Sequence, residues 1–155
     1  MQIVSESVAD TIRIGAKIAK YLHRGDILCL FGDLGSGKTV FVKGLASGLG
    51  VKKNKIISPS FILLCQYLDG RLPLYHLDLY RLKALPDIYS LGYEDYLYAD
   101  GVSVIEWPQR FKYLLPEKYL KVEFLIKSDT KRRIKFSGVG INLPVAAFRH
   151  PLRRG

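Results

Sequence analysis

The residues best suited to chemistry form a glycine-rich loop, in which Gly32, Gly37, Lys38 and Thr39 match the pattern Gly, four residues, Gly-Lys-Ser/Thr. Glycines allow main-chain amides to converge on phosphate oxygens without interference from side chains. Lys38 supplies a positive charge for the outer phosphates, and Thr39 offers a hydroxyl to a magnesium ion. A helix that begins here adds the positive end of its dipole. The pattern therefore predicts a phosphate-binding loop.

Two further polar groups follow apolar segments. Glu106 comes directly after Val102–Ile105, and phosphate-loop ATPases place an acid at such a strand end, where it reaches the magnesium ion. Asp78 and Arg81 follow another apolar segment. Asp78 could orient an attacking water or hold the ion through water, and Arg81 could neutralise phosphate charge. The alternative for these two is a solvent-facing ion pair. We interpret His76, beside them, as structural.

Other side chains have less specific signals. Thr11 could present its hydroxyl to the base or ribose of a nucleotide, although a surface position in a first helical turn is the alternative. Trp107 is the only tryptophan of the chain, and it either packs under the site or meets a partner. Five tyrosines crowd a segment with helical spacing, where we expect core packing first and a protein interface second: Tyr80, Tyr89, Tyr93, Tyr96 and Tyr98.

The elements that must position these residues alternate between strands and helices. Ile27–Phe31 is an apolar run without alternation, typical of a parallel strand buried on both faces. Apolar residues at helical spacing predict helices after Ser7 and after Lys38. Hairpins are predicted over 62–77 and 119–136. We therefore expect a single-domain α/β fold of the P-loop NTPase class, with a mostly parallel central sheet, flanking helices and an added β-hairpin portion.

Length and charge limit the remaining choices. The 155 residues suit one domain, which we place at 1–137, followed by a basic tail of uncertain order at 138–155. The net charge of +10 favours anionic partners such as nucleic acid, nucleotides or acidic proteins. No apolar run approaches the roughly 20 residues of a membrane span, so we expect a cytoplasmic protein without membrane contact. Cys29 and Cys65 lie in apolar segments, which predicts buried thiols and no disulfide.

Five segments in order resemble the TsaE family, the small bacterial ATPases of tRNA threonylcarbamoyladenosine biosynthesis. They are Gly32–Thr39, Ser58-Pro59-Ser60-Phe61, His76-Leu77-Asp78-Leu79-Tyr80-Arg81, Leu91–Tyr96 and Ile105-Glu106-Trp107. The resemblance implies an ATPase that uses Mg²⁺, hydrolyses ATP slowly by itself and works with the other protein subunits of the threonylcarbamoyl-transfer complex. ATP hydrolysis would regulate or reset that synthase, and the group transfer would belong to its partners. Contact with tRNA would be weak or indirect.

The resemblance also implies roles for individual residues. Thr39 and Glu106 would be the metal residues, and Asp78 with Lys38 would serve hydrolysis. Ser60 and Trp107 would form a switch or sensor. The nucleotide-binding residues would be Thr11, Gly35, Ser36, Gly37, Lys38, Thr39 and Val40. The family usually has threonine where this chain has Ser60 and Val40. Serine keeps the hydroxyl, whereas Val40 removes a donor near the α-phosphate.

Two other classes remain open at this point. A small-molecule kinase would need an acceptor pocket and an arginine-bearing lid, for which Arg110, Arg132 and Arg133 are the lid-like candidates. A nucleotide-gated binding module would use occupancy alone to tune association, and its ATP turnover would be incidental. Dependence of ATP consumption on a metabolite would favour the kinase.

Overall fold

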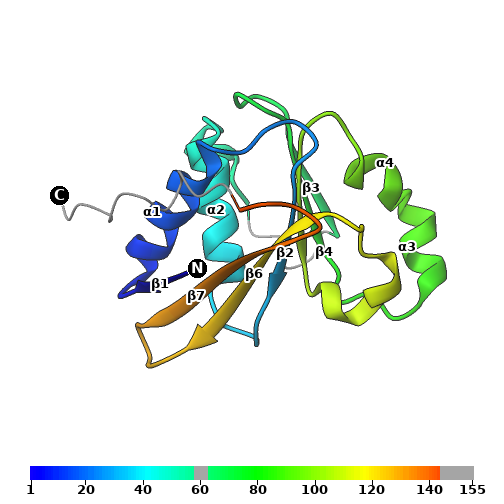
Figure 1. Ribbon diagram of the computed structural model, residues 1–155. Coiled ribbons are helices and arrows are strands. Elements are labelled where there is room, and N and C mark those ends of the chain that lie inside the picture. Colours follow the sequence, from blue (N-terminus) through cyan, green and yellow to red (C-terminus); the bar gives the residue numbers. More distant parts are fainter. Residues whose placement is uncertain (58–62, 144–155) are drawn as a thin grey trace.

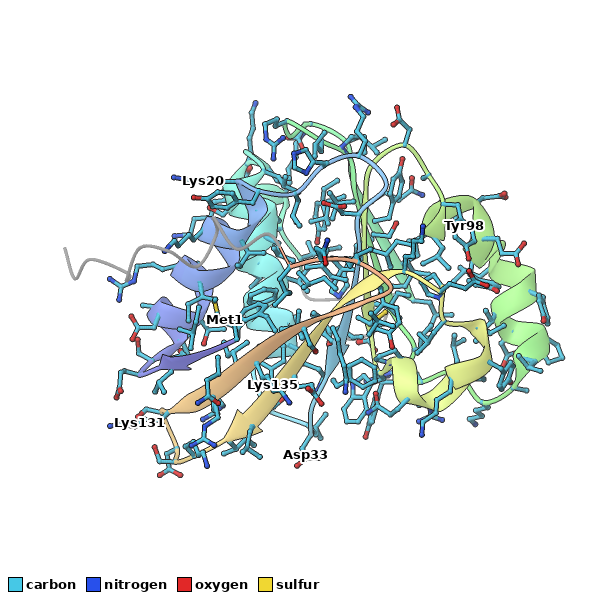
Figure 2. The ribbon with its side chains drawn as sticks, in the orientation of Figure 1. Met1, Lys20, Asp33, Tyr98, Lys131 and Lys135 are labelled. Atoms are coloured by element: carbon cyan, nitrogen blue, oxygen red, sulfur yellow. The ribbon has the colours of Figure 1, made fainter. Side chains whose placement is uncertain are left out.

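The computed structural model describes residues 1–57 and 63–143, which form a seven-stranded sheet with helices on both faces (Figure 1; Figure 2 adds the side chains). The sheet order is β1-β7-β6-β2-β5-β4-β3. Its strands are β1 (Gln2–Ser5), β2 (Ile27–Phe31), β3 (Leu64–Tyr67), β4 (Leu74–Asp78), β5 (Val102–Glu106), β6 (Tyr119–Ile126) and β7 (Arg132–Val139). The helices are α1 (Val8–Ala19), α2 (Lys38–Gly48), α3 (Leu85–Leu91) and α4 (Tyr93–Leu97), with 3₁₀ segments η1 (Lys53–Lys55) and η2 (Pro108–Leu114).

The centre of the sheet is parallel, and its edges are antiparallel. Strand β2 pairs with β5 and β6 in parallel, and β4 pairs with β5 in parallel. Antiparallel pairs add β3 to one edge and β7 with β1 to the other. The predicted α/β class with a parallel centre and added hairpins is therefore confirmed.

Strand β2 separates two hydrophobic cores. Leu28 and Leu30 belong to a core that α1 and α2 share, whereas Ile27 and Cys29 belong to a second core with residues of α3, α4 and η2. Successive side chains of a strand point to opposite faces, so an uninterrupted apolar run is needed where both faces are covered. Figure 1 shows the α1–α2 pair and the α3–α4 pair on opposite sides of the sheet.

Helices α1 and α2 approach each other at their backbones. A Cβ atom added to Gly44 would lie 2.3 Å from the carbonyl oxygen of Ile12, and one added to Gly15 would lie 2.4 Å from that of Phe41. Each helix can approach the backbone of the other this closely only at a glycine, which has no side chain. Helix α1 therefore holds the helix that begins at Lys38.

The structure differs from the sequence-based expectations in several elements. Strand β1 was not predicted, and it pairs along β7. The tyrosine-rich segment with helical spacing forms two short helices, α3 and α4, because Gly92 adopts a left-handed conformation with φ of 64° between them. Segment η2 was also not predicted. Strand β7 continues to Val139, beyond the boundary expected at 137, where it pairs with Tyr119 of β6.

Part of the expected organisation lies outside the described residues. This applies to Ser60, to the rest of the Ser58–Phe61 loop and to most of the basic tail. Cys29 and Cys65 are buried free thiols, as their apolar surroundings predicted. Within residues 1–57 and 63–143, no helix combines the length and apolar character needed to cross a membrane.

We predict that Gly44→Ala destabilises the fold, because the new methyl group would meet the backbone of α1 at Ile12. Overpacking costs about 1–3 kcal/mol, which exceeds the gain of about 1 kcal/mol in helix propensity. Urea unfolding followed by circular dichroism measures the change. Ser47→Ala, at an exposed position of α2, is the control and should leave stability within about 0.5 kcal/mol. Equal stability of the two variants would contradict the close helix contact.

Candidate nucleotide-binding site

The loop between β2 and α2 is built on positions that exclude side chains. Gly32 has a φ of 151°, and a Cβ atom there would lie 2.6 Å from Ser36 Oγ and 2.9 Å from the carbonyl oxygen of Phe124. Gly37 precedes α2 with a left-handed φ of 101°, and its carbonyl accepts the amide of Phe41 at 2.9 Å. The loop therefore turns tightly and leads directly into the amino end of α2, as the motif predicted.

The ammonium group of Lys38 lies inside this loop. Its Nζ donates to the carbonyl oxygens of Gly32 at 2.7 Å and Asp33 at 2.8 Å, with Ser36 Oγ at 3.4 Å. Burial lowers the pKa of Lys38, while the nearby carboxylates of Glu106, Asp78 and Asp33 oppose this change. Lys38 is thus held by groups that a phosphate could replace.

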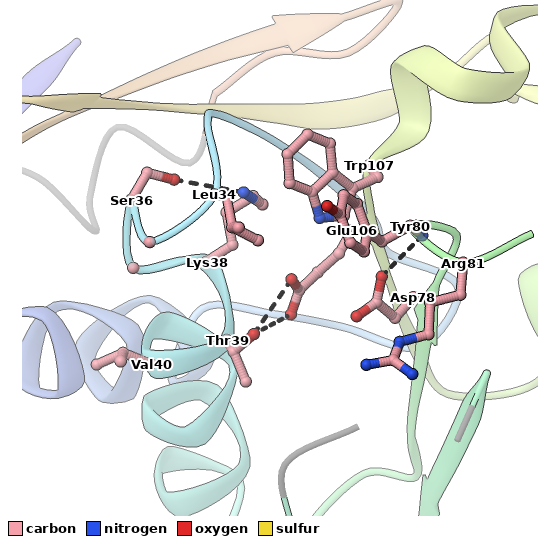
Figure 3. A pocket seen from close by; sticks show the side chains of 12 residues that line it. Leu34, Ser36, Lys38, Thr39, Val40, Asp78, Tyr80, Arg81, Glu106 and Trp107 are labelled. Carbon is pink, nitrogen blue, oxygen red and sulfur yellow. Dashed lines mark hydrogen bonds between the residues drawn. The ribbon is translucent and has the colours of Figure 1, made fainter. Parts of the chain in front are cut away.

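Glu106 joins the loop to the sheet. It is opposite Leu30 of β2 on one side and Asp78 of β4 on the other in the strand register. Thr39 Oγ1 donates to Glu106 Oε1 at 3.0 Å and to Oε2 at 3.2 Å (Figure 3). Glu106 as a whole is only 2 % exposed. The two predicted metal residues therefore lie in direct contact, although they are 67 positions apart in sequence.

Asp78 lies next to Glu106 at the end of β4. Its Oδ1 accepts the amide of Tyr80 at 2.9 Å. Burial raises the pKa of the Asp78 carboxyl, and the neighbouring charge of Glu106 adds to this. The hydrogen bond from the Tyr80 amide and the nearby side chains of His76 and Lys38 act in the opposite direction. The environment thus favours a carboxyl group that can accept a proton more readily than an exposed aspartate.

Trp107 turns the chain away from the end of β5. It has a φ of 58° and is the only non-glycine residue with positive φ in the described part of the chain. Such a backbone conformation costs about 1–3 kcal/mol and needs support from its surroundings. The centroid of the indole ring lies 4.1 Å from Lys38 Nζ, and the ring packs against Tyr80 at a centroid distance of 4.8 Å and a tilt of 40°. Trp107 therefore packs at the site, which was one of its two predicted roles.

These residues surround one cavity of about 310 Å³ (Figure 3). Its lining comes from the loop and from the ends of β4 and β5. All the residues to which the resemblance assigned a role line it, except Thr11 and Ser60. The full lining is Leu34, Gly35, Ser36, Gly37, Lys38, Thr39, Val40, Asp78, Tyr80, Arg81, Glu106 and Trp107.

A second cavity of about 190 Å³ lies on the other side of the loop. Thr11 lines it, but this residue is buried, and its hydroxyl contacts Ser5 Oγ at 2.7 Å and the carbonyl oxygen of Ser7 at 3.3 Å. The surface position considered for Thr11 is therefore wrong. Gly35, Gly37 and Val40 line both cavities. The two cavities therefore adjoin each other at the loop.

Sequence reasoning missed the contacts that two residues make at the site, because it named Arg132 only as a lid-like candidate of a kinase and His76 only as structural. Arg132 lines the second cavity and donates to the carbonyl oxygen of Gly35 at 3.2 Å, across 97 positions of sequence. His76 lies 2.8 Å from Glu106 Oε1 through its Nε2 atom. Neither has a local motif, since both contacts are made by the fold. The only available signal was that His76 and Asp78 alternate on one face of a strand that ends at the site.

The donor set fits a magnesium ion that arrives with a nucleotide. Thr39 and Glu106 present oxygen atoms, which Mg²⁺ prefers, and Mg²⁺ usually takes one or two protein ligands with phosphates and waters. Among the described residues, no three His, Cys, Asp or Glu side chains are grouped so that they could hold a metal by themselves. The protein groups therefore supply only part of a coordination shell.

A glycine-rich loop between a buried strand and a helix, with its threonine bonded to an acid on the neighbouring parallel strand, defines a P-loop NTPase. The family profile described as "Threonylcarbamoyl adenosine biosynthesis protein TsaE" matches residues 5–134. The chain therefore belongs to the TsaE family, as its motifs indicated.

Individual relatives agree with this assignment. The chain is 44% identical over 134 residues to "tRNA threonylcarbamoyladenosine biosynthesis protein TsaE" of Treponema pallidum, which covers 86% of this chain and 98% of that protein. A protein of the same name from Bacillus subtilis is 39% identical over 131 residues, covering 84% and 81%. The crystal structure of Bacillus subtilis YdiB has a TM-score of 0.74 and 35% identity, covering 90% of this chain and 86% of that one.

We predict that Arg132→Ala weakens ADP binding about 3–10-fold, because it removes one hydrogen bond to the loop and one wall of the second cavity. Isothermal titration calorimetry measures the affinity. Arg133→Ala is a matched control, since the adjacent Arg133 lines a different cavity on the opposite face of β7. Equal weakening by both variants would show a general effect of charge and would contradict a local role for Arg132.

Proposed function

We propose that this chain binds and hydrolyses ATP as a subunit of the assembly that makes threonylcarbamoyladenosine in tRNA. The names of its relatives support the pathway. The single observation that supports hydrolysis is the contact between Thr39 and Glu106, with Asp78 on the adjacent strand, because it gathers metal and water ligands beside the loop. Hydrolysis would regulate or reset the synthase, and partner subunits would transfer the group.

The loop and Lys38 would bind the phosphates of ATP. Main-chain amides at the start of α2 and the helix dipole attract an anion. Lys38 would exchange its bonds with the carbonyls of Gly32 and Asp33 for bonds with phosphate oxygens. Because charged partners give stronger hydrogen bonds than neutral carbonyls, this exchange favours the nucleotide-bound state.

Thr39 and Glu106 would hold the metal side of the nucleotide. Mg²⁺, when bound, would neutralise phosphate charge during transfer of the terminal phosphoryl group to water. The Thr39 hydroxyl donates a hydrogen bond to Glu106, so the lone pairs of its Oγ1 atom remain available to a metal ion. Glu106 would act on the ion either directly or through water.

Asp78 would orient the attacking water and accept its proton. The raised pKa of Asp78 suits this role, since a better base removes a proton more readily. Arg81, which lines the same cavity, would balance charge on the terminal phosphate. We also propose that the second cavity, with Thr11, Val40 and Arg132, receives the ribose or base.

Trp107 would sense the nucleotide through Lys38. The indole contacts the ammonium group, so movement of Lys38 toward phosphate would change the environment of the ring. Ser60, which lies outside the described residues, would complete this switch. Ordering of a loop by nucleotide and its release on hydrolysis would change the surface that partner subunits meet. Contact with tRNA would be weak or indirect.

We predict that Lys38→Ala, Asp78→Ala and Glu106→Ala each lower the ATPase rate by about 100-fold or more, because each removes a group that binds phosphate, water or metal. Steady-state phosphate release, with the partner subunits and Mg²⁺ present, measures the rate. Lys43→Ala, on the same helix as Lys38, serves as the control and should keep the activity. Survival of activity in all three site variants would show that the assignment is wrong.

We further predict that Asp78→Asn binds ATP within about threefold of the unchanged chain but loses about 100-fold or more in hydrolysis, because the amide cannot accept the proton of water. Calorimetry gives the affinity, and phosphate release gives the rate. Formation of threonylcarbamoyladenosine in the reconstituted assembly should also stop over repeated turnovers. Continued modification by this variant would instead favour a binding module whose ATP turnover is incidental.

A further inference from the structure

A buried histidine contacts the acid at the centre of the site. His76 of β4 is 1 % exposed, and Glu106 of β5 is 2 % exposed. The distance from His76 Nε2 to Glu106 Oε1 is 2.8 Å. Because an ionised carboxylate can only accept, Nε2 is the donor in this pair. The imidazole therefore fixes one oxygen of a carboxyl group that is otherwise bonded to Thr39.

Packing alone does not account for an imidazole at this position. The neighbours of His76 in the sheet register are Cys65 on β3 and Val104 on β5, which are both apolar and buried. An apolar side chain would fill the same space without the cost of burying a ring nitrogen. The property that His76 adds is a hydrogen-bond donor directed at Glu106.

The three side chains form a chain of hydrogen bonds from the core to the loop. His76 donates a hydrogen bond to Glu106, and Glu106 accepts another from the Thr39 hydroxyl. A hydroxyl group whose proton is fixed in one direction presents its lone pairs in the other. If Glu106 rotated, the Thr39 hydroxyl would lose this orientation. The position of His76 therefore determines whether Thr39 and Glu106 are arranged for a cation.

We propose that His76 is a positioning residue, which holds Glu106 so that Thr39 and Glu106 present their oxygens to Mg²⁺. This inference rests on the proposed function, since it concerns the metal that accompanies ATP. His76 touches neither nucleotide nor metal in this scheme, and it acts only through Glu106. Mutation of a residue that hydrogen-bonds a metal ligand typically lowers metal affinity or activity about 10–100-fold.

The test compares His76→Leu, which removes the donor, with His76→Gln, which keeps an amide donor. ATP is titrated into each purified chain in EDTA and then with increasing Mg²⁺, and the fluorescence of Trp107, the only tryptophan, reports binding. We expect ATP affinity in EDTA to stay within about twofold for both variants. The Mg²⁺ midpoint is the concentration that gives half of the fluorescence change. It should rise about 10–100-fold in His76→Leu and much less in His76→Gln.

A control variant distinguishes the positioning of Glu106 by His76 from a general effect on core packing. Cys65→Ala changes the buried neighbour of His76 without touching Glu106, so it should lower thermal stability but leave the Mg²⁺ midpoint unchanged. If His76→Leu does not fold, His76→Asn replaces it, since its shorter amide cannot reach Glu106. It should show the same raised midpoint.

Two results would overturn the role of His76 and leave the proposed function intact. One is an unchanged Mg²⁺ midpoint in a folded variant that lacks the donor. The other is an equal loss of ATP affinity with and without Mg²⁺, which is the signature of a purely structural effect. An unchanged chain that binds ATP with no response to Mg²⁺ would overturn the metal part of the proposed function, and this inference with it.

Discussion

The hydrogen bond from Thr39 to Glu106 is the contact on which the arrangement of the site depends. Thr39 lies in the first turn of the helix that follows the loop, and Glu106 ends the neighbouring strand, so this bond connects the two parts of the chain that carry the chemistry. It exists because β2 and β5 are parallel and aligned with Leu30 opposite Glu106. A shift of the register by one residue would turn Glu106 to the other face of the sheet.

Charge balance is the second constraint on this region. Lys38 is largely removed from water, which lowers its pKa, yet the carboxylates of Glu106, Asp78 and Asp33 act against this. The same burial raises the pKa of Asp78, where Lys38 in turn favours the charged form. Buried charges are tolerated only where they are paired or hydrogen-bonded. The cation and the acids therefore support one another before any ligand is bound.

The sequence indicated the site well because its main parts are local patterns. An apolar strand before the loop, the spacing of Gly32, Gly37 and Lys38, and an acid after Val102–Ile105 can each be read from a few consecutive residues. Contacts between distant segments could not be read in this way. Arg132 meets Gly35 across 97 positions, and His76 meets Glu106 across 30, so only the sheet topology brings them together. Strand β1 was missed because four residues are too few to show a period.

The backbone contact between α1 and α2 restrains one wall of the larger cavity more than the other. The wall that carries Lys38 and Thr39 belongs to a helix braced against Ile12 at Gly44, and it cannot slide without a steric clash. Another part of the lining consists of side chains such as Tyr80, which is exposed, and Trp107. A ligand in this cavity would therefore have the packed helix on one side and individual side chains on the other.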